Sequence, residues 1–321
     1  MQITAFQPDH IPAAAALFID NLKQQRTILP ILPDRLENPQ TVAEKLGGFI
    51  QYGPAFAALD GGKLVGYLGA YLVEGFRDTD RKAAYCPEWG YGTIRSGSPA
   101  ITQALYRAAA AEWTRAGCHT HAITLLAHDH AAEKVWFWNG FGLAVVDAVR
   151  PFTPLEGVRA DGYTVRKATS ADVETLAILD AEHIDHYTQP PTLMTPRTLT
   201  DVAAFAELLT NPHHSVWLAE QDGAPMGFMR FEGSSFGAAD VINAETTTTI
   251  TGAYVRPAYR GRRAAVALLD GALRDYAARG FACCAVNFES FNPEAADFWM
   301  KYFTPACYSL MRVPESLRLP G

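Results

Sequence analysis

Three arginines around one glycine form the part of the sequence best suited to hold a charged ligand. Arg260, Arg262 and Arg263 lie within four residues of chain, and Gly261 separates the first two. Each arginine carries a permanent positive charge, and a glycine lets a ligand approach the backbone closely. The segment therefore suits a polyphosphate, although the same arginines would also simply solvate the start of a helix.

This turn is expected to connect a strand to a helix. The apolar, β-prone run before it ends at Val255, because Pro257 cannot continue a central ladder. From Arg263 to Gly280 apolar residues return at helical spacing. The first N–H groups of a helix lack intrahelical partners and carry the positive end of its dipole, so they would face the same ligand.

The segment resembles the acetyl-CoA-binding motif of the GNAT superfamily of N-acetyltransferases. That motif is Arg or Gln, two residues, Gly, one residue, then Gly or Ala, usually inside a phrase like V-x-P-x-Y-R-G. The matching positions here are Val255, Pro257, Tyr259, Arg260, Gly261 and Ala265. Arg263 stands where the family normally has its first glycine, which is a departure from the pattern.

A second family motif follows the penultimate predicted strand. GNAT domains commonly show Asn, then Ala, then an aromatic pair ending in Tyr, and here Asn292 is followed at that spacing by Ala295, Phe298 and Trp299. In many family members the tyrosine is proposed to protonate the departing CoA thiolate, which an indole cannot do. Another acid or a water would replace it, or the thiolate leaves unassisted, as a thiol pKa of about 8.5 permits. Alternatively, Trp299 only fills the core.

The sequence contains an internal repeat. Trp299 follows Trp136 by 163 residues. The same shift relates Tyr91 to Tyr254, Leu105 to Leu268, Ala109 to Ala272 and Gly117 to Gly280. Each half gives the same order: a strand, two helical stretches, a hairpin, a strand entering the turn before a long helix, a penultimate strand, a short helix and a final strand.

This order predicts a mixed α+β fold and is also the element order of the GNAT fold. We expect two GNAT-like domains, each a mixed, mainly antiparallel sheet flanked by helices. The predicted domains are residues 1–153 and 162–321, joined by the turn-rich segment 151–162. Final strands over residues 143–148 and 307–312 are expected to close the two copies.

The two copies differ at the anion-binding turn. At the position of the arginines, the first copy has Gly97–Thr102, which contains no cation, and Pro99 has no N–H to offer a phosphate. The N-terminal domain is therefore predicted to be degenerate, binding acetyl-CoA weakly or not at all. It would support the second domain and wall one side of the substrate cleft.

The resemblance implies a specific set of acetyl-CoA contacts in the C-terminal copy. In the family, the splayed end of the strand before the turn holds the pantetheine arm and supplies an N–H that polarises the thioester carbonyl. The implied cofactor-binding residues are Ala253, Tyr254, Val255, Arg260, Gly261, Arg262, Arg263, Ala264, Ala265, Asn292, Phe298 and Trp299. Acetyl-CoA would act as a co-substrate, and no metal is expected.

The base for the acceptor amine is not fixed by a motif. Some family members carry a catalytic Glu on the strand before the turn, but the corresponding position falls near Thr249, which cannot serve. Glu289, at the end of the penultimate strand, is the predicted catalytic residue, and Glu245 is the other nearby carboxylate. Either carboxylate would equally fit a solvent-facing role.

Two histidines and a loop complete the predicted features of this copy. His183 and His186, with Glu182 and Asp185 on the same helix, suggest a metal site, but no third ligand follows at a convincing spacing. A solvated helix face is therefore favoured. The Pro- and Thr-rich loop 187–200 lies where GNAT proteins vary to recognise acceptors, so it is the predicted substrate wall.

Composition limits the compartment and the partners. The net charge of −7 argues against a nucleic-acid partner, whose phosphates need a basic face. The sequence shows no secretory signal and no run of about 20 apolar residues, so no membrane partner is expected. Five cysteines without metal spacing indicate reduced thiols and a cytoplasmic protein.

The predicted function is direct transfer of an acetyl group from acetyl-CoA to the amine of a small molecule, in the C-terminal domain. Two alternatives remain open at this point. One is a non-catalytic pseudo-enzyme that binds acyl-CoA or senses a metabolite. The other is an acetyltransferase for a protein or peptide terminus, which would need an open acceptor groove.

Overall fold

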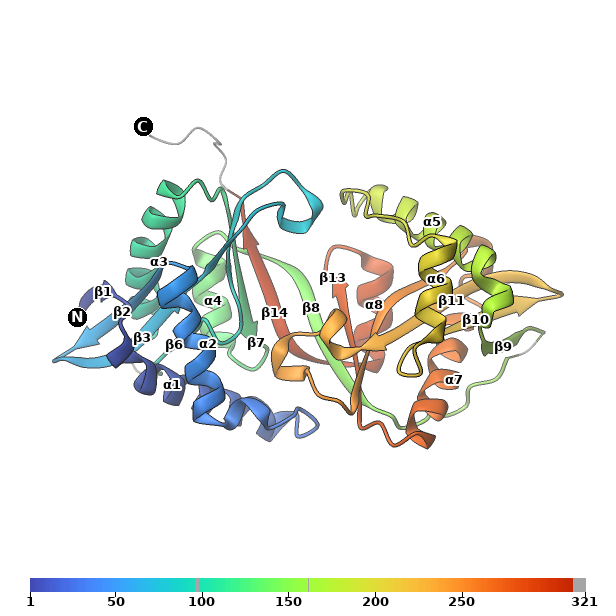
Figure 1. The fold of residues 1–321 in the computed structure, drawn as a ribbon, viewed down its shortest axis with the longest axis horizontal. Helices are drawn as coiled ribbons and strands as arrows, with labels where there is room; N and C mark the ends of the chain where they lie inside the picture. Colours follow the sequence, from blue (N-terminus) through green and yellow to red (C-terminus); the bar gives the residue numbers. More distant parts are fainter. Residues whose placement is uncertain (96–97, 161, 314–321) are drawn as a thin grey trace. The chain divides into compact units, whose positions relative to one another are not determined.

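The computed structural model describes residues 1–95, 98–160 and 162–313 (Figure 1). It divides into two compact units, one formed by Met1–Asp147 together with the chain from Pro305 onward, the other by Ala148–Thr304. Each unit combines helices with mainly antiparallel strands. The predicted α+β class is confirmed.

The second unit is built on five neighbouring strands. In spatial order they are β13 (Cys283–Glu289), β12 (Thr247–Val255), β11 (Ala224–Gly233), β10 (Ser215–Gln221) and β9 (Thr164–Lys167). The β12–β13 pair is parallel, and the other pairs are antiparallel. Asp222 and Gly223 join β10 to β11 with positive φ angles of 52° and 78°, as a tight hairpin turn requires.

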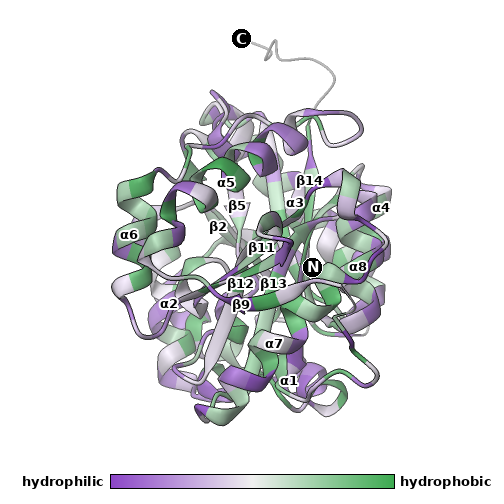
Figure 2. Cartoon of the chain, turned by 90° about the vertical axis from the view of Figure 1, so that its right-hand side faces the viewer, coloured by the Kyte–Doolittle hydropathy of each residue, from purple (hydrophilic) through white to green (hydrophobic). Residues whose placement is uncertain are grey.

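Helices cover both faces of this sheet. Val216 and Leu218 of β10 pack against α5 (Val173–Thr188) and α6 (Val202–Thr210). Trp217, between them, packs against Gly271 of α7 (Ala264–Ala278), so α7 covers the opposite face. The mixed colouring of α7 in Figure 2 matches a helix with one face on the sheet and one in solvent. The short helix α8 (Pro293–Tyr302) packs beside β13.

The first unit contains the corresponding elements. Its helices are α1 (Ile11–Ile28), α2 (Pro39–Tyr52), α3 (Ser98–Arg115) and α4 (His130–Trp138). Its strands are β1 (Gln2–Ala5), β2 (Ala55–Asp60), β3 (Lys63–Gly69), β4 (Tyr71–Val73), β5 (Ala83–Cys86), β6 (Tyr91–Thr93) and β7 (Thr120–Leu126). The division between the units falls within β8 (Gly142–Pro151).

Strand pairing confirms that the two halves are copies of one fold. In each half the first strand pairs antiparallel with the first strand of a hairpin, β1 with β2 and β9 with β10. Each hairpin has a register shift at the corresponding place, between Ala58 and Leu59 and between Ala219 and Glu220. Each half also has one parallel pair ahead of its short helix, β5–β7 and β12–β13.

The last strand differs from the sequence-based expectation. β14 (Thr304–Arg312) was expected to close the C-terminal copy, but it pairs antiparallel with β7, with Cys307 opposite Leu126 and Arg312 opposite His121. The Arg312 guanidinium also donates a 2.9 Å hydrogen bond to the Tyr106 hydroxyl. The apolar alternation predicted a strand correctly but does not encode which partner it joins. The domain boundaries proposed from the linker composition stay a prediction.

Two further features concern the cysteines and the length of the apolar helices. All five cysteines are buried and none forms a disulfide. No helix in the described part of the chain has the length and apolar character needed to cross a bilayer.

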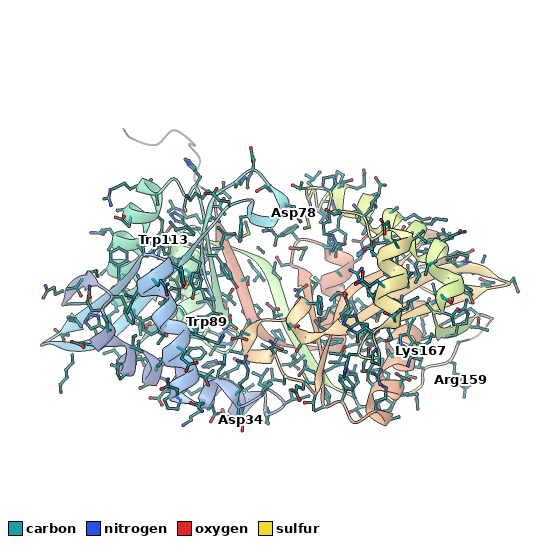
Figure 3. All side chains as sticks on the ribbon, viewed as in Figure 1. Asp34, Asp78, Trp89, Trp113, Arg159 and Lys167 are labelled. Atoms are coloured by element: carbon teal, nitrogen blue, oxygen red, sulfur yellow. The ribbon has the colours of Figure 1, made fainter. Side chains whose placement is uncertain are left out.

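The first unit has a dense aromatic core. Trp136 is fully buried and meets the rings of Tyr91, Tyr106 and Phe141 edge-on, at centroid distances of 5.0 to 5.5 Å. Trp136 therefore fills the core of the first unit. Trp113 (Figure 3) is 1% exposed and lies 5.1 Å from the His121 ring.

The buried His121 makes the first unit sensitive to acid. Burial, reinforced by the Arg312 charge, lowers the pKa of His121 from 6.5 to about 4. The unfolded chain therefore binds a proton that the folded chain does not between these pH values, and stability falls as the pH drops through this window. We expect His121→Gln to reduce the pH dependence of the unfolding free energy in this window by up to about 1.4 kcal/mol per pH unit. Denaturant unfolding at pH 7, 6 and 5 measures it; equal slopes in both proteins would contradict the assignment.

Candidate functional site

An opening between two strands is the main feature of the second unit. The parallel register of β12 with β13 runs from Thr247 opposite Cys283 to Ile250 opposite Val286, where it ends within the described residues. β12 continues to Val255 and stays paired with β11 on its other edge. The peptide groups of residues 251–255 thus have one edge without a strand partner, which is a place where an extended ligand can add main-chain hydrogen bonds.

A β-bulge sets this divergence. Arg230 lies opposite Gly252 and Phe231 opposite Ile250, so Thr251 is an extra residue on β12. Arg230 holds the bulge through Nε to Thr251 Oγ1 at 2.9 Å and Nη2 to the Thr251 carbonyl at 3.2 Å. Glu232 pairs with the same guanidinium at 3.2 Å. The bend is therefore built into the sheet by a largely buried ion pair.

The arginine-rich turn has the backbone conformation that a glycine would favour. After a short turn over Pro257–Tyr259, Gly261 has φ 76° and Arg263 has φ 64°, and α7 begins at Ala264. A left-handed conformation costs a non-glycine residue about 1–2 kcal/mol. Arg263 thus holds a left-handed conformation that a glycine would adopt without strain, at a cost in conformational energy.

The three arginines have different surroundings. Arg260 donates from Nε to the Val255 carbonyl at 3.0 Å and pairs with Glu294 at 3.3 Å. Arg262 instead donates to Gln221 at 3.0 Å, with its guanidinium 5.6 Å from the Tyr259 ring centroid. Arg260 and Arg263 line the cavity described next, whereas Arg262 is directed toward the end of β10.

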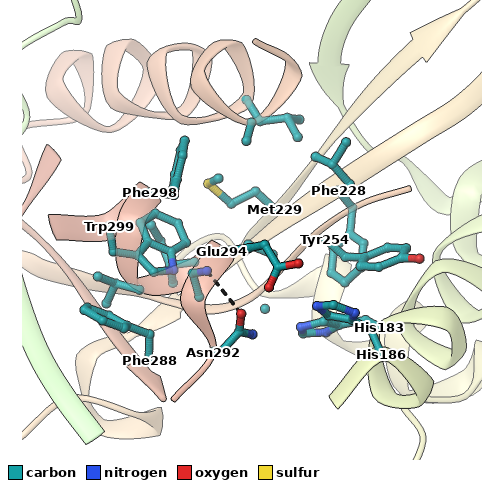
Figure 4. Close-up of a pocket in the computed structure, with 18 of the residues that line it drawn as sticks. His183, His186, Phe228, Met229, Tyr254, Phe288, Asn292, Glu294, Phe298 and Trp299 are labelled. Atoms are coloured by element: carbon teal, nitrogen blue, oxygen red, sulfur yellow. Dashed lines mark hydrogen bonds between the residues drawn. The ribbon is translucent and has the colours of Figure 1, made fainter. Parts of the chain in front are cut away.

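One cavity of about 1000 Å³ adjoins the opening and the turn (Figure 4). Most of the sequence-predicted residues line it: Ala253, Tyr254, Val255, Arg260, Gly261, Arg263, Ala264, Ala265, Asn292, Phe298, Trp299 and the predicted base Glu289. Glu245 is exposed on the loop before β12 and Thr249 is buried within the strand. The structure thus brings the residues of both motifs together, while their role in acetyl-CoA binding stays a prediction.

The short helix α8 contributes one wall. The Asn292 side chain accepts a hydrogen bond from the Ala295 N–H at 3.2 Å and so caps the helix (Figure 4). Trp299 is 5% exposed and packs edge-on against Phe298, with ring centroids 4.7 Å apart. Tyr302, one turn further along the same helix, also lines the cavity. Its spacing of three residues from Trp299 is a sequence signal that it shares a helix face with Trp299.

The opposite wall of the cavity is formed by α5, and its two histidines do not lie where the sequence predicted. His183 and His186 were expected on a solvated helix face, but His183 is only 3% exposed and both line the cavity. The spacing showed that they share a face of α5 and not that this face turns inward. Glu182 pairs with Arg256 at 2.6 Å. Within residues 1–95, 98–160 and 162–313, no group of three or more His, Cys, Asp or Glu side chains could hold a metal ion.

Burial sets the protonation of the groups on this wall. His183 has its pKa lowered by burial, and its Nδ1 lies 3.9 Å from Asp180, beyond hydrogen-bonding range. That Nδ1 has no hydrogen-bond partner in the described structure. Burial raises the pKa of Tyr187, the Glu289 charge raises it further and the Arg197 charge opposes this. Burial likewise raises the pKa of Tyr254, so both phenols are hydrogen-bond donors at neutral pH.

The predicted substrate loop also reaches the cavity. Met194 and Arg197, from the segment 187–200, are among the lining residues. The Arg197 guanidinium stacks over the Tyr187 ring at 5.5 Å. The lining of the cavity thus falls into two sets of residues: the α7 turn with α8, called here the donor end, and α5 with this loop and Glu289, called here the acceptor end. Which ligand either set holds is a prediction.

Within the described residues, the start of α3 in the first unit has no counterpart of the arginine-rich turn. Of the predicted Gly97–Thr102 segment, Gly97 lies outside the described residues, and α3 has begun at Ser98. The Ser98 hydroxyl is 2.9 Å from Thr93 Oγ1, and the Thr102 hydroxyl is 2.6 Å from the Tyr91 hydroxyl. These polar groups at the helix start are engaged internally. That the first copy binds acetyl-CoA weakly or not at all stays a prediction.

Residues 179–303, which contain the splayed strands, the turn and α8, match the family model described as "Acetyltransferase (GNAT) family". This part of the chain is therefore similar to the GNAT family of acetyltransferases. A crystal structure of a GCN5-related N-acetyltransferase from Sphaerobacter thermophilus is similar, with TM-score 0.61 and 16% identity over 97% of this chain and 95% of that one.

Two other solved structures extend the comparison. One is a GCN5-related glucosamine N-acetyltransferase region of a fungal multi-domain β-N-acetylglucosaminidase, with TM-score 0.54 and 14% identity over 97% of this chain and 38% of that one. The other is a tandem GNAT protein from the clavulanic acid biosynthesis pathway, with TM-score 0.48 and 14% identity over 98% and 99%. The comparison with curated protein sequences returned no match.

Because Arg263 is held in a left-handed conformation, replacing it by glycine should stabilise the second unit. Arg263→Gly should raise the free energy of unfolding of the second unit by about 1 kcal/mol, since the strain exceeds the entropy that glycine loses on folding. Arg263→Ala is the matched control, because it removes the same charge and keeps the strain. Urea unfolding of the three proteins measures the difference. A glycine variant no more stable than the alanine variant would show that the conformation carries no strain.

Proposed function

We propose that the second unit of this protein transfers an acetyl group from acetyl-CoA to the amine of a small molecule. One observation carries the proposal: the unpaired edge of β12 and the positively charged start of α7 open into the same cavity. An extended pantetheine arm needs the first, and a pyrophosphate needs the second.

At the donor end, charge and exposed backbone favour the pyrophosphate. Arg260 and Arg263 supply the cations, and Gly261 together with the first N–H groups of α7 allows close approach. Trp299 and Phe298 give an apolar wall for the arm. Those N–H groups of Ala253–Val255 that face the open edge of β12 would pair with its amides and polarise the thioester carbonyl.

At the acceptor end, Glu289 is the proposed base. Its carboxylate takes one proton from the ammonium group of the acceptor, and the neutral amine then attacks the thioester carbon. A C–N bond forms and the C–S bond breaks. The nitrogen loses a second proton as the amide forms, and the CoA sulfur gains one to leave as a thiol.

The proton for the sulfur cannot come from Trp299. The phenols of Tyr187 and Tyr254 line the cavity, and their raised pKa values keep them protonated at neutral pH. Either would serve as the acid, and unassisted departure of the thiolate is also chemically tolerable. The tryptophan is the observation that favours the competing function, a non-catalytic acyl-CoA-binding protein.

Calorimetry with acetyl-CoA tests the donor site. We expect one site per chain, and Arg260→Ala with Arg263→Ala should weaken binding at least about tenfold, because two charge-assisted contacts are lost. Arg262→Ala is the matched control: it removes a charge from the same turn but one directed at Gln221. Its affinity should stay within about threefold of the wild type.

The outcomes separate the candidate functions. A loss of affinity in Arg262→Ala as large as that in the double variant would show that only the overall charge of the turn matters, and would contradict the proposed geometry. Two sites per chain would show that the first unit also binds. Binding without turnover of any amine would favour the non-catalytic alternative.

Glu289→Gln tests the proposed base. Removing a general base lowers the rate of the chemical step by about 10²- to 10⁴-fold. We therefore expect kcat to fall by this factor while the affinity for acetyl-CoA is unchanged. Glu245→Gln, which changes an exposed carboxylate outside the cavity, is the control. Release of free thiol, followed colorimetrically, measures the rates. Unchanged kcat in Glu289→Gln would assign the base elsewhere.

A further inference from the structure

The acceptor end of the cavity contains a cation that the proposed acetyl transfer does not use. Arg197 lines the cavity from the 187–200 loop, a different segment from the turn that holds Arg260 and Arg263. Its guanidinium stacks on Tyr187 at 5.5 Å, and its charge lowers the pKa values of both Tyr187 and His183. These three effects place the charge beside the residues that form the acceptor wall.

Among the described residues, Arg197 has no carboxylate partner. Within the residues that the structure describes, it makes no ion pair, whereas Arg260 pairs with Glu294 and Arg256 with Glu182. The cavity that it lines also has apolar side chains in its wall, such as Met194 and Phe228. A guanidinium without an ion-pair partner in such a cavity gains from binding an anionic ligand.

An opposite charge lies on the same wall. Glu289 raises the pKa of Tyr187 while Arg197 lowers it, so the phenol is close to both an anion and a cation. The hydroxyl itself remains a donor at neutral pH. The acceptor end therefore has a carboxylate, Glu289, that can bind an ammonium group. It also has the Arg197 guanidinium and the Tyr187 hydroxyl, which can bind an anion.

We propose that the acceptor is an amine that also carries a carboxylate, bound through Arg197 while Glu289 faces its ammonium group. This inference rests on the proposed acetyl transfer and specifies its substrate class. Arginine and carboxylate match in shape as well as charge, because the planar fork can donate two parallel hydrogen bonds. The stacking on Tyr187 holds the guanidinium in one orientation before the acceptor arrives.

The test compares amino acids with their uncharged carboxamides, which have nearly the same shape. The probes are glycine, β-alanine, 4-aminobutyrate, L-lysine and L-phenylalanine, each against its amide, with acetyl-CoA as donor and thiol release as the readout. We expect kcat/KM for at least one acid to exceed that of its amide by about 10- to 100-fold. Arg197→Ala should remove this preference by lowering the rate with the acid alone, and Arg197→Lys should keep part of it.

Controls separate this inference from the proposed function. Thr198→Ala, an exposed neighbour on the same loop, should keep the preference. Arg197→Ala should keep wild-type affinity for acetyl-CoA in calorimetry; a weakened affinity would assign Arg197 to the donor and overturn the inference.

Three further results would also overturn it. They are equal rates for acids and amides, equal losses on both in Arg197→Ala, and no turnover of any probe by a protein that binds acetyl-CoA. A protein that does not bind acetyl-CoA at all would instead refute the proposed function on which the inference rests.

Discussion

The end of pairing between β12 and β13 is the constraint on which the site depends. Two neighbouring strands ordinarily satisfy each other's backbone groups, and separating them leaves polar groups that need another partner. Here the bulge at Thr251 turns β12, and the Arg230–Glu232 pair holds the bulge from the neighbouring strand. The open edge of β12 is thus stabilised by a largely buried ion pair and does not depend on the ligand alone.

Three elements converge on this opening because of the order in which the chain leaves the sheet. β12 runs directly into the arginine-rich turn and α7, so the open edge and the positive helix start lie in the same cavity. β13 ends at Glu289 and passes within a few residues into α8, which is capped by Asn292. The local sequence therefore fixes the donor end of the cavity almost completely.

This explains what the sequence could predict. The hairpins, the turn and the α8 cap are encoded by residues close together in the chain. The fold class was predictable because both halves of the sequence show the same order of elements. The inward orientation of His183 was missed, because helical spacing shows which residues share a face but not what covers it. The partner of β14 was missed for a related reason, since an alternating strand pattern suits several neighbours equally well.

The substrate end depends on longer-range contacts and is correspondingly less visible in the sequence. Arg197 lies on a loop without periodicity, and its position over Tyr187 comes from tertiary packing. Arg262 shows the opposite case: it belongs to a recognisable motif, yet its side chain turns to Gln221. Motifs thus identify backbone geometry more securely than the direction of each side chain.

The most direct test of the account is amide hydrogen exchange of the intact chain with and without acetyl-CoA. If the open edge of β12 and the start of α7 hold the ligand, the amides of residues 251–255 and 261–266 will gain protection. Those at the start of α3, residues 98–102, will not change. Protection at α3, or binding without any protection along 251–255, would contradict the central claim that the splayed strand forms the acetyl-CoA site.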